Sequence, residues 1–281
     1  MPGFIAAGCF RLALGKPLIM GVVNVTPDSF SDGGRFLNSS EAVVHARQMI
    51  EEGADMLDIG GESSRPGADG VSAEEEIRRT VPVIEALRSC GVPLSIDTAK
   101  ATVMRAAIAA GASMVNDIEA LQAPGALEVL KDSDAAVCLM HMQGKPRTMQ
   151  MSPEYRDVVA QVKAFLEARA AAVAASGVAP ERIIVDPGFG FGKTVDHNLE
   201  LLRRLAEIAG GSYPVLAGLS RKSSLGVITG RATGNRLHAS TAAALLAAER
   251  GAAILRVHDV AATRDALSVL AAVLRGSHTP T

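Results

Sequence analysis

Carboxylate, amide and lysine side chains follow short apolar runs along this chain, and their types suit the binding of a flat ring rich in nitrogen. The four that we expect to face one another are Asp97, Asn116, Asp186 and Lys222. A carboxylate accepts two parallel N–H bonds and an amide both donates and accepts, so the set matches a planar heterocycle with paired donors. Lys222 would then contact a ring carbonyl or nitrogen. The alternative for Lys222 is a plain ion pair with an aspartate.

A second group of residues has the types that hold a diphosphate. Arg256 and His258 follow the last apolar run, and Ser220 lies in a polar loop before it. Loops after the late strands of barrels often bind phosphate. With Asn24 added, the set predicts a diphosphate rather than a single phosphate. Asn24 would then be a Mg²⁺ ligand, because Mg²⁺ takes few protein ligands and keeps phosphate oxygens and waters.

The histidines leave other chemistry open. His258 could instead be a metal ligand or an acid–base group, with His141 and His197 as possible partners in a metal site. No cysteine or serine in the sequence has the neighbouring base that covalent catalysis requires. We therefore expect no covalent enzyme intermediate.

Residues 182–193 show how the elements position these side chains. Ile183, Ile184 and Val185 form an apolar run that is too short for a helix, and Asp186 and a glycine-rich loop follow it. This pattern is typical of a buried parallel strand. Similar runs lie at 56–60, 94–98, 113–117 and 255–259. Any one of the aspartates could be only a helix cap, but the carboxyl ends of parallel strands share one face, so the side chains are expected to converge there.

About eight strand–helix units in 281 residues predict an α/β protein with a (β/α)₈ barrel, or TIM barrel. An open doubly wound sheet is the alternative. Residues 1–16 predict a short N-terminal hairpin, 17–275 a single barrel domain and 276–281 a tail. The long polar loops 26–38 and 61–72 follow the first two strands, and we expect them to act as lids.

Several helix boundaries can be predicted from local signals. Ser72 and Glu75 form a capping box, and Pro82 is expected to kink or restart the helix that follows. Apolar spacing predicts a helix over 41–52. The sequence Ser-Pro-Glu at 152–154 predicts the start of a long helix.

Composition excludes several classes of protein. The net charge of −2 gives no field suited to nucleic acid or an anionic membrane, and no apolar run approaches membrane-spanning length. Cys9, Cys90 and Cys138 show no metal or disulfide spacing, so we expect each to be a small buried hydrophobic residue. The N-terminus lacks the basic region of a signal peptide. We expect a cytoplasmic protein whose partners are small molecules.

These stretches together resemble the dihydropteroate synthases, from about Pro17 to Leu274. The motifs that carry the resemblance are residues 20–34, 60–67, 95–98, 116–118, 140–144, 186–193, 220–223 and 256–260. The resemblance implies a pterin-binding barrel that condenses (7,8-dihydropterin-6-yl)methyl diphosphate with 4-aminobenzoate, giving 7,8-dihydropteroate and diphosphate in folate biosynthesis. It further implies a Mg²⁺-dependent, homodimeric transferase that is a sulfonamide target.

The same resemblance assigns roles to individual residues. The implied catalytic residues are Asp97, Asp186, Lys222 and Arg256, and the implied metal ligand is Asn24. The implied substrate contacts are Ser64, Asp97, Asn116, Ile118, Met140, Asp186, Gly218, Lys222, Arg256 and His258. The implied aminobenzoate pocket consists of Asp28, Phe30, Ser63, Ser64, Arg65, Pro66, Phe191 and Ser223. Ser64 stands where many members have threonine, and it keeps the hydroxyl.

An aromatic amine is a weak nucleophile, and no residue of the sequence offers a dedicated base, so we expect an SN1-like reaction. Two other functions remain as alternatives. A corrinoid-linked pterin methyltransferase would share the aspartate and asparagine positions but would not need residues 220–222 or the two lid loops. A non-catalytic pterin-binding protein is the other. The predicted homodimer would use alanines of the late helices, namely Ala239, Ala242, Ala243, Ala247 and Ala248, unless these pack on the barrel.

Overall fold

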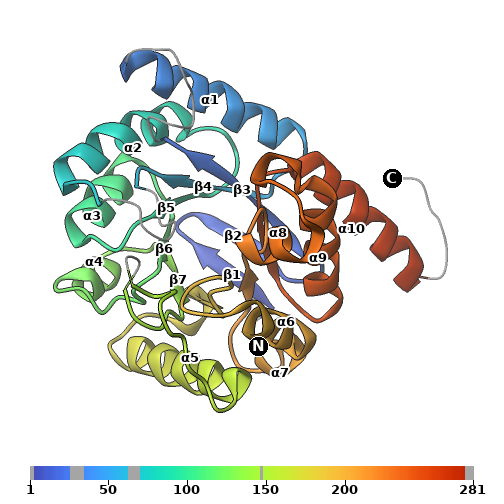
Figure 1. Cartoon of the computed structure of the whole chain (residues 1–281). Coiled ribbons are helices and arrows are strands. Elements are labelled where there is room, and N and C mark those ends of the chain that lie inside the picture. The colour runs from blue at the N-terminus through green and yellow to red at the C-terminus, as the bar shows by residue number, and fades with distance from the viewer. Residues whose placement is uncertain (1–2, 26–34, 63–69, 146–147, 276–281) are drawn as a thin grey trace.

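Eight parallel strands form a barrel that the helices surround (Figure 1). The computed structural model describes residues 3–25, 35–62, 70–145 and 148–275. The barrel strands are β3 (Leu18–Asn24), β4 (Met56–Gly60), β5 (Leu94–Asp97), β6 (Met114–Asp117), β7 (Ala136–Met140), β8 (Ile183–Asp186), β9 (Leu216–Ala217) and β10 (Ile254–Val257). They pair in the order β8-β7-β6-β5-β4-β3-β10-β9, and a parallel bridge between Val185 and Val215 joins the two ends of this order. The predicted (β/α)₈ barrel is therefore confirmed, and the open sheet is wrong.

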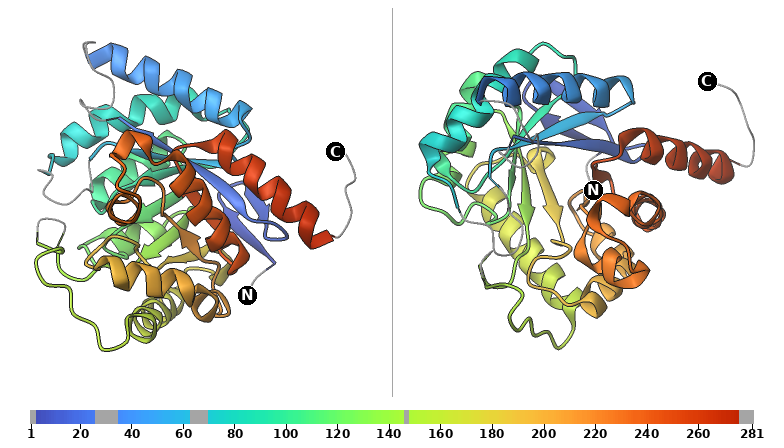
Figure 2. Two further views of the ribbon diagram at one scale, coloured as in Figure 1. Left: turned by 45° about the vertical axis from the view of Figure 1, so that its right-hand side comes forward. Right: turned by 45° about the horizontal axis from the view of Figure 1, so that its top comes forward.

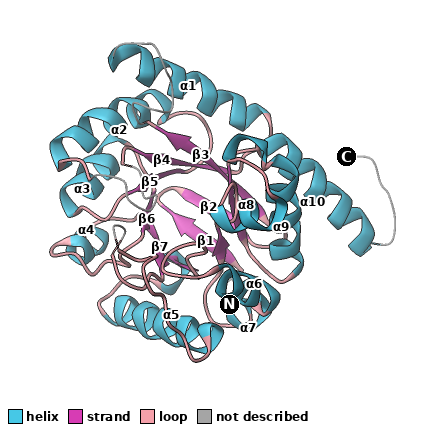
Figure 3. Cartoon of the chain, viewed as in Figure 1, coloured by secondary structure: helices cyan, strands magenta, loops and turns pink. Residues whose placement is uncertain are grey.

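Helices follow the strands and form the outer layer (Figure 3). They are α1 (Arg35–Glu51), α2 (Ala73–Leu87), α3 (Ala101–Ala110), α4 (Ala126–Lys131), α5 (Val158–Ala175), α6 (Val195–Arg203), α7 (Leu205–Ala209), α8 (Ser223–Thr229), α9 (Leu237–Glu249) and α10 (Val260–Arg275), with 3₁₀ turns at Pro180–Arg182 and Thr233–Asn235. Figure 2 shows that the end of α10 extends away from the barrel. No helix in the described part of the chain is long and apolar enough to cross a membrane.

One of two helix starts predicted from capping signals agrees with the structure. Ser72 accepts a hydrogen bond from the amide of Glu75, as predicted, and α2 continues through Pro82 because Val83, Ile84 and Leu87 pack in the core. The predicted start at 152–154 is wrong. Asp157 caps α5 by accepting from the amides of Val159 and Ala160, so the helix begins at Val158.

Helix α1 begins at Arg35, six residues before the predicted start. The apolar spacing marked only the part of this helix that packs on the barrel, where Ala42, Ala46 and Met49 are buried. Apolar periodicity therefore predicted which part of the helix packs on the barrel, but it did not predict the residue at which the helix begins.

The N-terminal hairpin covers one end of the barrel. Strands β1 (Phe4–Ala7) and β2 (Phe10–Ala13) pair antiparallel, as predicted. Ile5 and Ala7 are fully buried, and they pack on side chains from the first residues of the barrel strands, among them Leu18 and Met114. The opposite end of the barrel, where the strands end, is the one left for a ligand, and we call it the mouth.

The cysteines lie in three different environments. Cys138 on β7 is buried, Cys90 is half-buried and Cys9 is exposed, and all three are free thiols. The prediction of burial is confirmed for Cys138 and wrong for Cys9, because the latter lies in the tight turn of the hairpin, away from its packed face.

Candidate active site at the mouth of the barrel

Strand register places the predicted aspartates and asparagine side by side at the mouth. Asp97 is the last residue of β5 and pairs in register with Asn116 of β6, while Gly60 of β4 lies on its other side. Asp186 ends β8, next to Met140 of β7. The barrel therefore brings the predicted aspartates and asparagine to one face.

An ion-pair network spans the mouth, and we call it the arginine network. The Arg256 guanidinium donates from Nε to Asp58 at 2.6 Å and from a terminal nitrogen to Asp97 at 2.7 Å. Asn116 donates to the same Asp58 oxygen at 2.9 Å. Asp58 is fully buried, and its second oxygen has no hydrogen-bond partner among the described residues. The Arg256 cation joins β10 to β4 and β5, and Asp58 links β6 to them through Asn116.

The predicted convergence of aspartates on this face includes Asp58 of the run 56–60, but the site roles assigned from the sequence leave Asp58 out. Asp58 lies two residues before the end of β4, so it forms the floor of the mouth and not its rim. A buried carboxylate that holds a partly buried arginine is costly to assemble, and such groups concentrate at functional sites.

Burial shifts the protonation of the two rim aspartates. It raises the pKa of Asp97 to about 7, with Arg256 opposing this shift and Asp58 adding to it. Burial also raises the pKa of Asp186, against the hydrogen bond that its carboxylate accepts from the Gly188 amide at 2.7 Å. Arg256 keeps a raised pKa because the two carboxylates outweigh its own burial. Both rim carboxyls therefore respond to a ligand that brings N–H donors.

An apolar and cationic wall lies beside Asp186. The Nζ atom of Lys222 lies 4.1 Å from the centre of the Phe191 ring. Phe191 packs with Met140, and Ile118 packs at the edge of the same cluster. This arrangement brings three predicted substrate contacts, Lys222, Met140 and Ile118, together with Phe191 of the predicted aminobenzoate pocket, and it suits one face of a flat ring.

The loops after β9 and β10 meet at His258. Ser220 Oγ accepts from the backbone amide of His258 at 3.2 Å and lies 2.9 Å from its Nδ1. Arg221 has a left-handed φ of 58° and pairs with Asp259 at 2.7 Å, which ties the two loops together. Gly218 lies beside Arg256, where an added Cβ would be in ordinary contact with the arginine side chain.

The predicted metal ligand, Asn24, lies at the end of β3 on the same rim. A Cβ added at Gly60 would lie 3.9 Å from Asn24 Oδ1 and 3.8 Å from an Asp97 oxygen, so the glycine keeps the space between these oxygens open. The described residues contain no group of three His, Cys, Asp or Glu side chains that could hold a metal. One neutral amide oxygen beside a carboxylate fits Mg²⁺ that takes its other ligands from phosphate and water.

The other histidines do not serve as metal ligands in this arrangement. His141 Nδ1 lies 3.0 Å from the Nζ of Lys193, and burial together with that lysine lowers the pKa of the imidazole to about 3. His197 belongs to the capping box of α6 with Thr194. The metal alternative is therefore not supported for these two residues. Lys193 is a second residue that sequence reasoning missed, although it ends the glycine-rich loop 187–193.

Six of the predicted aminobenzoate-pocket residues, Asp28, Phe30, Ser63, Ser64, Arg65 and Pro66, lie outside the described residues, and so does most of the two loops that carry them. The remaining two are described. Phe191 lies at the mouth beside Lys222, and Ser223 is exposed at the start of α8.

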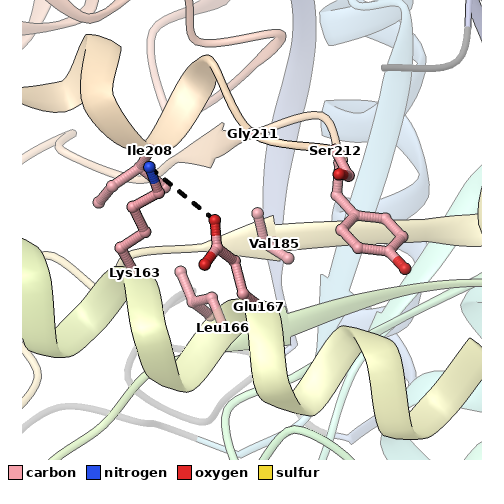
Figure 4. Close-up of a pocket in the computed structure, with 8 residues that line it drawn as sticks. Lys163, Leu166, Glu167, Val185, Ile208, Gly211 and Ser212 are labelled. Carbon is pink, nitrogen blue, oxygen red and sulfur yellow. Dashed lines mark ion pairs between the residues drawn. The ribbon is translucent and has the colours of Figure 1, made fainter.

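A small pocket also occurs away from the mouth, in the helical layer (Figure 4). It lies between α5, α7 and the segment before β9, and Lys163 and Glu167 line it with an ion distance of 3.9 Å. Val185 faces it from the outer side of β8. Its charged groups already pair with each other, so it does not compete with the mouth as a substrate site.

Comparisons with known proteins agree with this geometry. The chain matches the family model described as pterin binding enzyme over residues 20–258. It is 53% identical over 270 residues to the dihydropteroate synthase of Neisseria meningitidis serogroup B, covering 94% of this chain and 95% of that protein. It is 48% identical over 264 residues to the enzyme of that name from Escherichia coli, covering 94% of each.

Solved structures show the same barrel. Xanthomonas albilineans dihydropteroate synthase with 4-aminobenzoic acid has a TM-score of 0.91 at 52% identity, covering 99% of this chain and 100% of that one. The Burkholderia cenocepacia enzyme complexed with 7,8-dihydropteroate has a TM-score of 0.90 at 52% identity, covering 98% of each chain. The Yersinia pestis enzyme in a sulfonamide drug complex has a TM-score of 0.92 at 45% identity, covering 97% and 99%. This chain therefore belongs to the dihydropteroate synthase family of pterin-binding enzymes.

Proposed function

We propose that the mouth of this barrel condenses (7,8-dihydropterin-6-yl)methyl diphosphate with 4-aminobenzoate, forming 7,8-dihydropteroate and diphosphate. The observation that carries the proposal is the convergence of Asp97, Asn116 and Asp186 with Lys222 at the end of the barrel opposite the hairpin. The relatives solved with 4-aminobenzoic acid and with 7,8-dihydropteroate, each at 52% identity, support the same pair of substrates.

The pterin ring fits between the rim carboxyls and the wall at Phe191. In this proposal Asp97 and Asp186 accept from the paired N–H groups of the ring, Asn116 donates and accepts beside them, and Lys222 contacts a ring acceptor. Their preset positions matter because donors and acceptors that are already in place need no reorganisation during the reaction. Met140, Ile118 and Gly218 complete the substrate contacts.

The diphosphate belongs at the loops after β9 and β10. We propose that His258 and Arg256 contact it, with Ser220 holding the imidazole. Arg256 also binds Asp97, so the same guanidinium links the pterin site to the diphosphate site. Asn24 would hold Mg²⁺, which neutralises charge on the leaving diphosphate when it is bound.

The reaction follows an SN1-like course in this proposal. The bond between the pterin CH₂ group and the bridging oxygen breaks first, and its electron pair leaves with the diphosphate. The electron-rich pterin stabilises the cation at CH₂, and the carboxylates of Asp97 and Asp186 supply negative charge nearby. The amine nitrogen of 4-aminobenzoate then forms the new C–N bond and loses a proton to water. No described side chain needs to act as a dedicated base.

Residues around the loops 26–38 and 61–72, with Phe191 and Ser223, form the proposed aminobenzoate pocket. The Yersinia pestis relative is solved in a sulfonamide drug complex. We infer that sulfonamides compete with 4-aminobenzoate on this chain as well.

One experiment separates the three candidate functions. The protein is mixed with both substrates and Mg²⁺, and diphosphate and dihydropteroate are quantified. We expect equal amounts of the two products. A pterin-binding protein would bind the pterin without releasing diphosphate. A corrinoid-linked methyltransferase would give neither product but would methylate a corrinoid from a methylated pterin, and either outcome would refute the proposal.

The chain is also proposed to form a homodimer through its late helices. Exposed apolar side chains gather there, namely Val227 and Ile228 of α8, Leu237 and Leu246 of α9, and Val269, Val273 and Leu274 of α10. Ala243, Ala247 and Ala248 are buried in the barrel core, which supports the alternative that these alanines pack on the barrel. We expect a dimer in sedimentation equilibrium at micromolar concentration. Ile228→Asp should dissociate it, whereas Val44→Asp on α1 should not.

A cytoplasmic location is consistent with three free cysteines, since oxidising compartments favour disulfides. The domain boundaries at 16/17 and 275/276 stay predictions.

A further inference from the structure

We propose that Lys193 is the positioning residue of the pterin site, because its buried ammonium fixes the loop that presents Asp186 and Phe191. The inference rests on the proposed function of the mouth. Lys193 itself touches neither proposed substrate.

Lys193 is enclosed by acceptors from two loops. Only 2% of the residue is exposed. Its Nζ lies 3.0 Å from His141 Nδ1, 3.0 Å from the Gly188 carbonyl oxygen and 2.9 Å from that of Phe191. An ammonium has three donors, and these three acceptors use them all. The His141 carbonyl is a fourth, longer neighbour at 3.3 Å.

The forms of the two partners are linked. When Lys193 is an ammonium it can only donate, so Nδ1 of the neutral His141 then accepts and the imidazole proton lies on Nε2. Burial lowers the pKa of the Lys193 amine to about 7, and the nearby Asp186 carboxylate opposes that shift. No carboxylate pairs with the ammonium directly among the described residues, so its hydrogen bonds go to carbonyl and imidazole acceptors. A methionine would fill the same space without the desolvation cost of a charge, so packing alone does not explain a lysine here.

The loop 187–193 has a shape that brings its backbone close to the loop after β7, and Lys193 lies between them. Gly188, Gly190 and Gly192 have φ values of 69°, 80° and 61°, in the left-handed region that favours glycine. A Cβ added at Gly188 would overlap the carbonyl oxygen of His141, so the two loops approach each other backbone to backbone. The Nζ of Lys193 lies 3.3 Å from the His141 carbonyl oxygen and 3.0 Å from that of Gly188, so it donates to acceptors from both loops at this approach.

The same loop contacts two groups that would touch the pterin, Asp186 and Lys222. The Gly188 amide donates to Asp186 at 2.7 Å, while the Gly188 carbonyl is held by Lys193. The Phe191 carbonyl is held by Lys193, while its ring faces the Nζ of Lys222 at 4.1 Å. Lys193 thus acts on both Asp186 and Lys222 through a single intervening residue in each case.

The test compares Lys193→Met with a matched control, Lys163→Met, which removes a half-exposed lysine on α5. Affinity for the pterin diphosphate and for 4-aminobenzoate, kcat and the melting temperature are measured on the purified full-length chain. We expect Lys193→Met to weaken pterin binding about tenfold or more, since buried acceptors lose their donor, and the control to bind as the wild type does. Values are normalised to the folded fraction, so a loss of stability alone does not mimic this result.

A double-mutant cycle separates positioning from stability. Lys193→Met and Asp186→Asn are combined, and pterin affinity is measured for all four proteins. We expect the double variant to lose less affinity than the product of the two single losses, because both changes disable the same carboxylate. Additive losses, or a Lys193→Met protein that binds pterin like the wild type, would overturn the proposal.

A second variant keeps the test decisive if Lys193→Met does not fold. Lys193→Gln retains amide donors for the carbonyls but lacks the charge, and it is carried through the same cycle. Failure of the wild type itself to bind the pterin diphosphate would refute the proposed function. A wild type that binds pterin, with a Lys193→Gln variant that binds it equally well, would refute only the role of Lys193.

Discussion

Arg256 donates from Nε to the buried carboxylate of Asp58 at 2.6 Å, although 198 positions of the chain separate the two residues. Strands β3 and β4 connect them in the sheet, since β10 pairs with β3 and β3 with β4. The Arg256 cation is thereby held over the floor of the mouth while its other arm reaches Asp97 at 2.7 Å. Floor and rim are joined by one side chain.

Removing the charge of Asp58 should destabilise the fold. Asp58→Asn removes the charge of a fully buried carboxylate and leaves Arg256, whose side chain is 20% exposed, with Asp97 as its remaining carboxylate partner. We therefore expect the loss to fall below the cost of breaking a fully buried pair, which is about 3–5 kcal/mol. Urea unfolding measures this loss. The matched control is Glu249→Gln, whose pair with Arg250 is largely exposed, and it should change stability by less than about 1 kcal/mol. Equal effects of the two substitutions would argue against a buried network.

Pterin binding should release a proton at mildly acidic pH. The pKa of Asp97 is about 7 because of burial, so the carboxyl is largely protonated at pH 6. N–H donors of a pterin favour the carboxylate and lower this pKa, so binding drives the proton off. Affinity should rise with pH up to about 7 and then level. Calorimetry in two buffers of different ionisation enthalpy measures the release, which should fall in Asp97→Asn. Heats at pH 6 that do not depend on the buffer would contradict this.

Lys222→Ala should slow turnover by about 10²–10³-fold, the effect of losing one preset charged group at the reacting ligand. The Nζ of Lys222 lies over the Phe191 ring, so the position of the charge matters. Lys222→Arg keeps the charge but changes the shape of the charged group, and it should restore only part of the rate. Lys131→Ala at the exposed end of α4 is the control and should leave the rate unchanged. Steady-state assays at saturating substrates give the comparison, and a wild-type rate in Lys222→Ala would remove this residue from the mechanism.

Chelation should abolish activity, because Arg256 and His258 leave much of a diphosphate's charge uncompensated. Full activity in excess EDTA would exclude an essential metal. If Asn24 is the ligand, Asn24→Ala should raise the Mg²⁺ concentration for half-maximal rate by about tenfold, the loss of one ligand of modest strength. Asn235→Ala, at an exposed position, should not shift the Mg²⁺ titration.

The order of bond breaking can be tested with isotopes. The bridging oxygen of the pterin diphosphate is labelled with ¹⁸O, and the protein is incubated with it in the absence of 4-aminobenzoate. Reversible formation of the cation should scramble label into non-bridging positions. Restricted rotation of the diphosphate could hide this, so the chemical step is also measured with substituted anilines. No scrambling together with a steep rise of rate with amine basicity would show concerted attack.

Local sequence determined the elements of this protein and most of the rim of its site. Apolar runs such as 183–185 are short, and a polar residue ends each of them, so the placement of Asp97, Asn116 and Asp186 at strand ends follows from local pattern alone. The hairpin and the N-cap at Ser72 are equally local, although the Glu75 carboxylate pairs with Arg78 and Arg79 and does not close the predicted capping box.

Only the tertiary structure decided which of these polar side chains pair with each other and which residues from other loops contact them. Arg256 could be assigned to a diphosphate from its place near the end of the last apolar run, but its pairing with Asp58 and Asp97 depends on strand order and register across 198 and 159 positions. From the sequence, Lys193 is only the last residue of a glycine-rich loop. In the folded chain the loop after β7 packs against it and places His141 next to its Nζ. Ion pairing and burial depend on distances between segments that are remote in sequence, and only the closed barrel sets those distances.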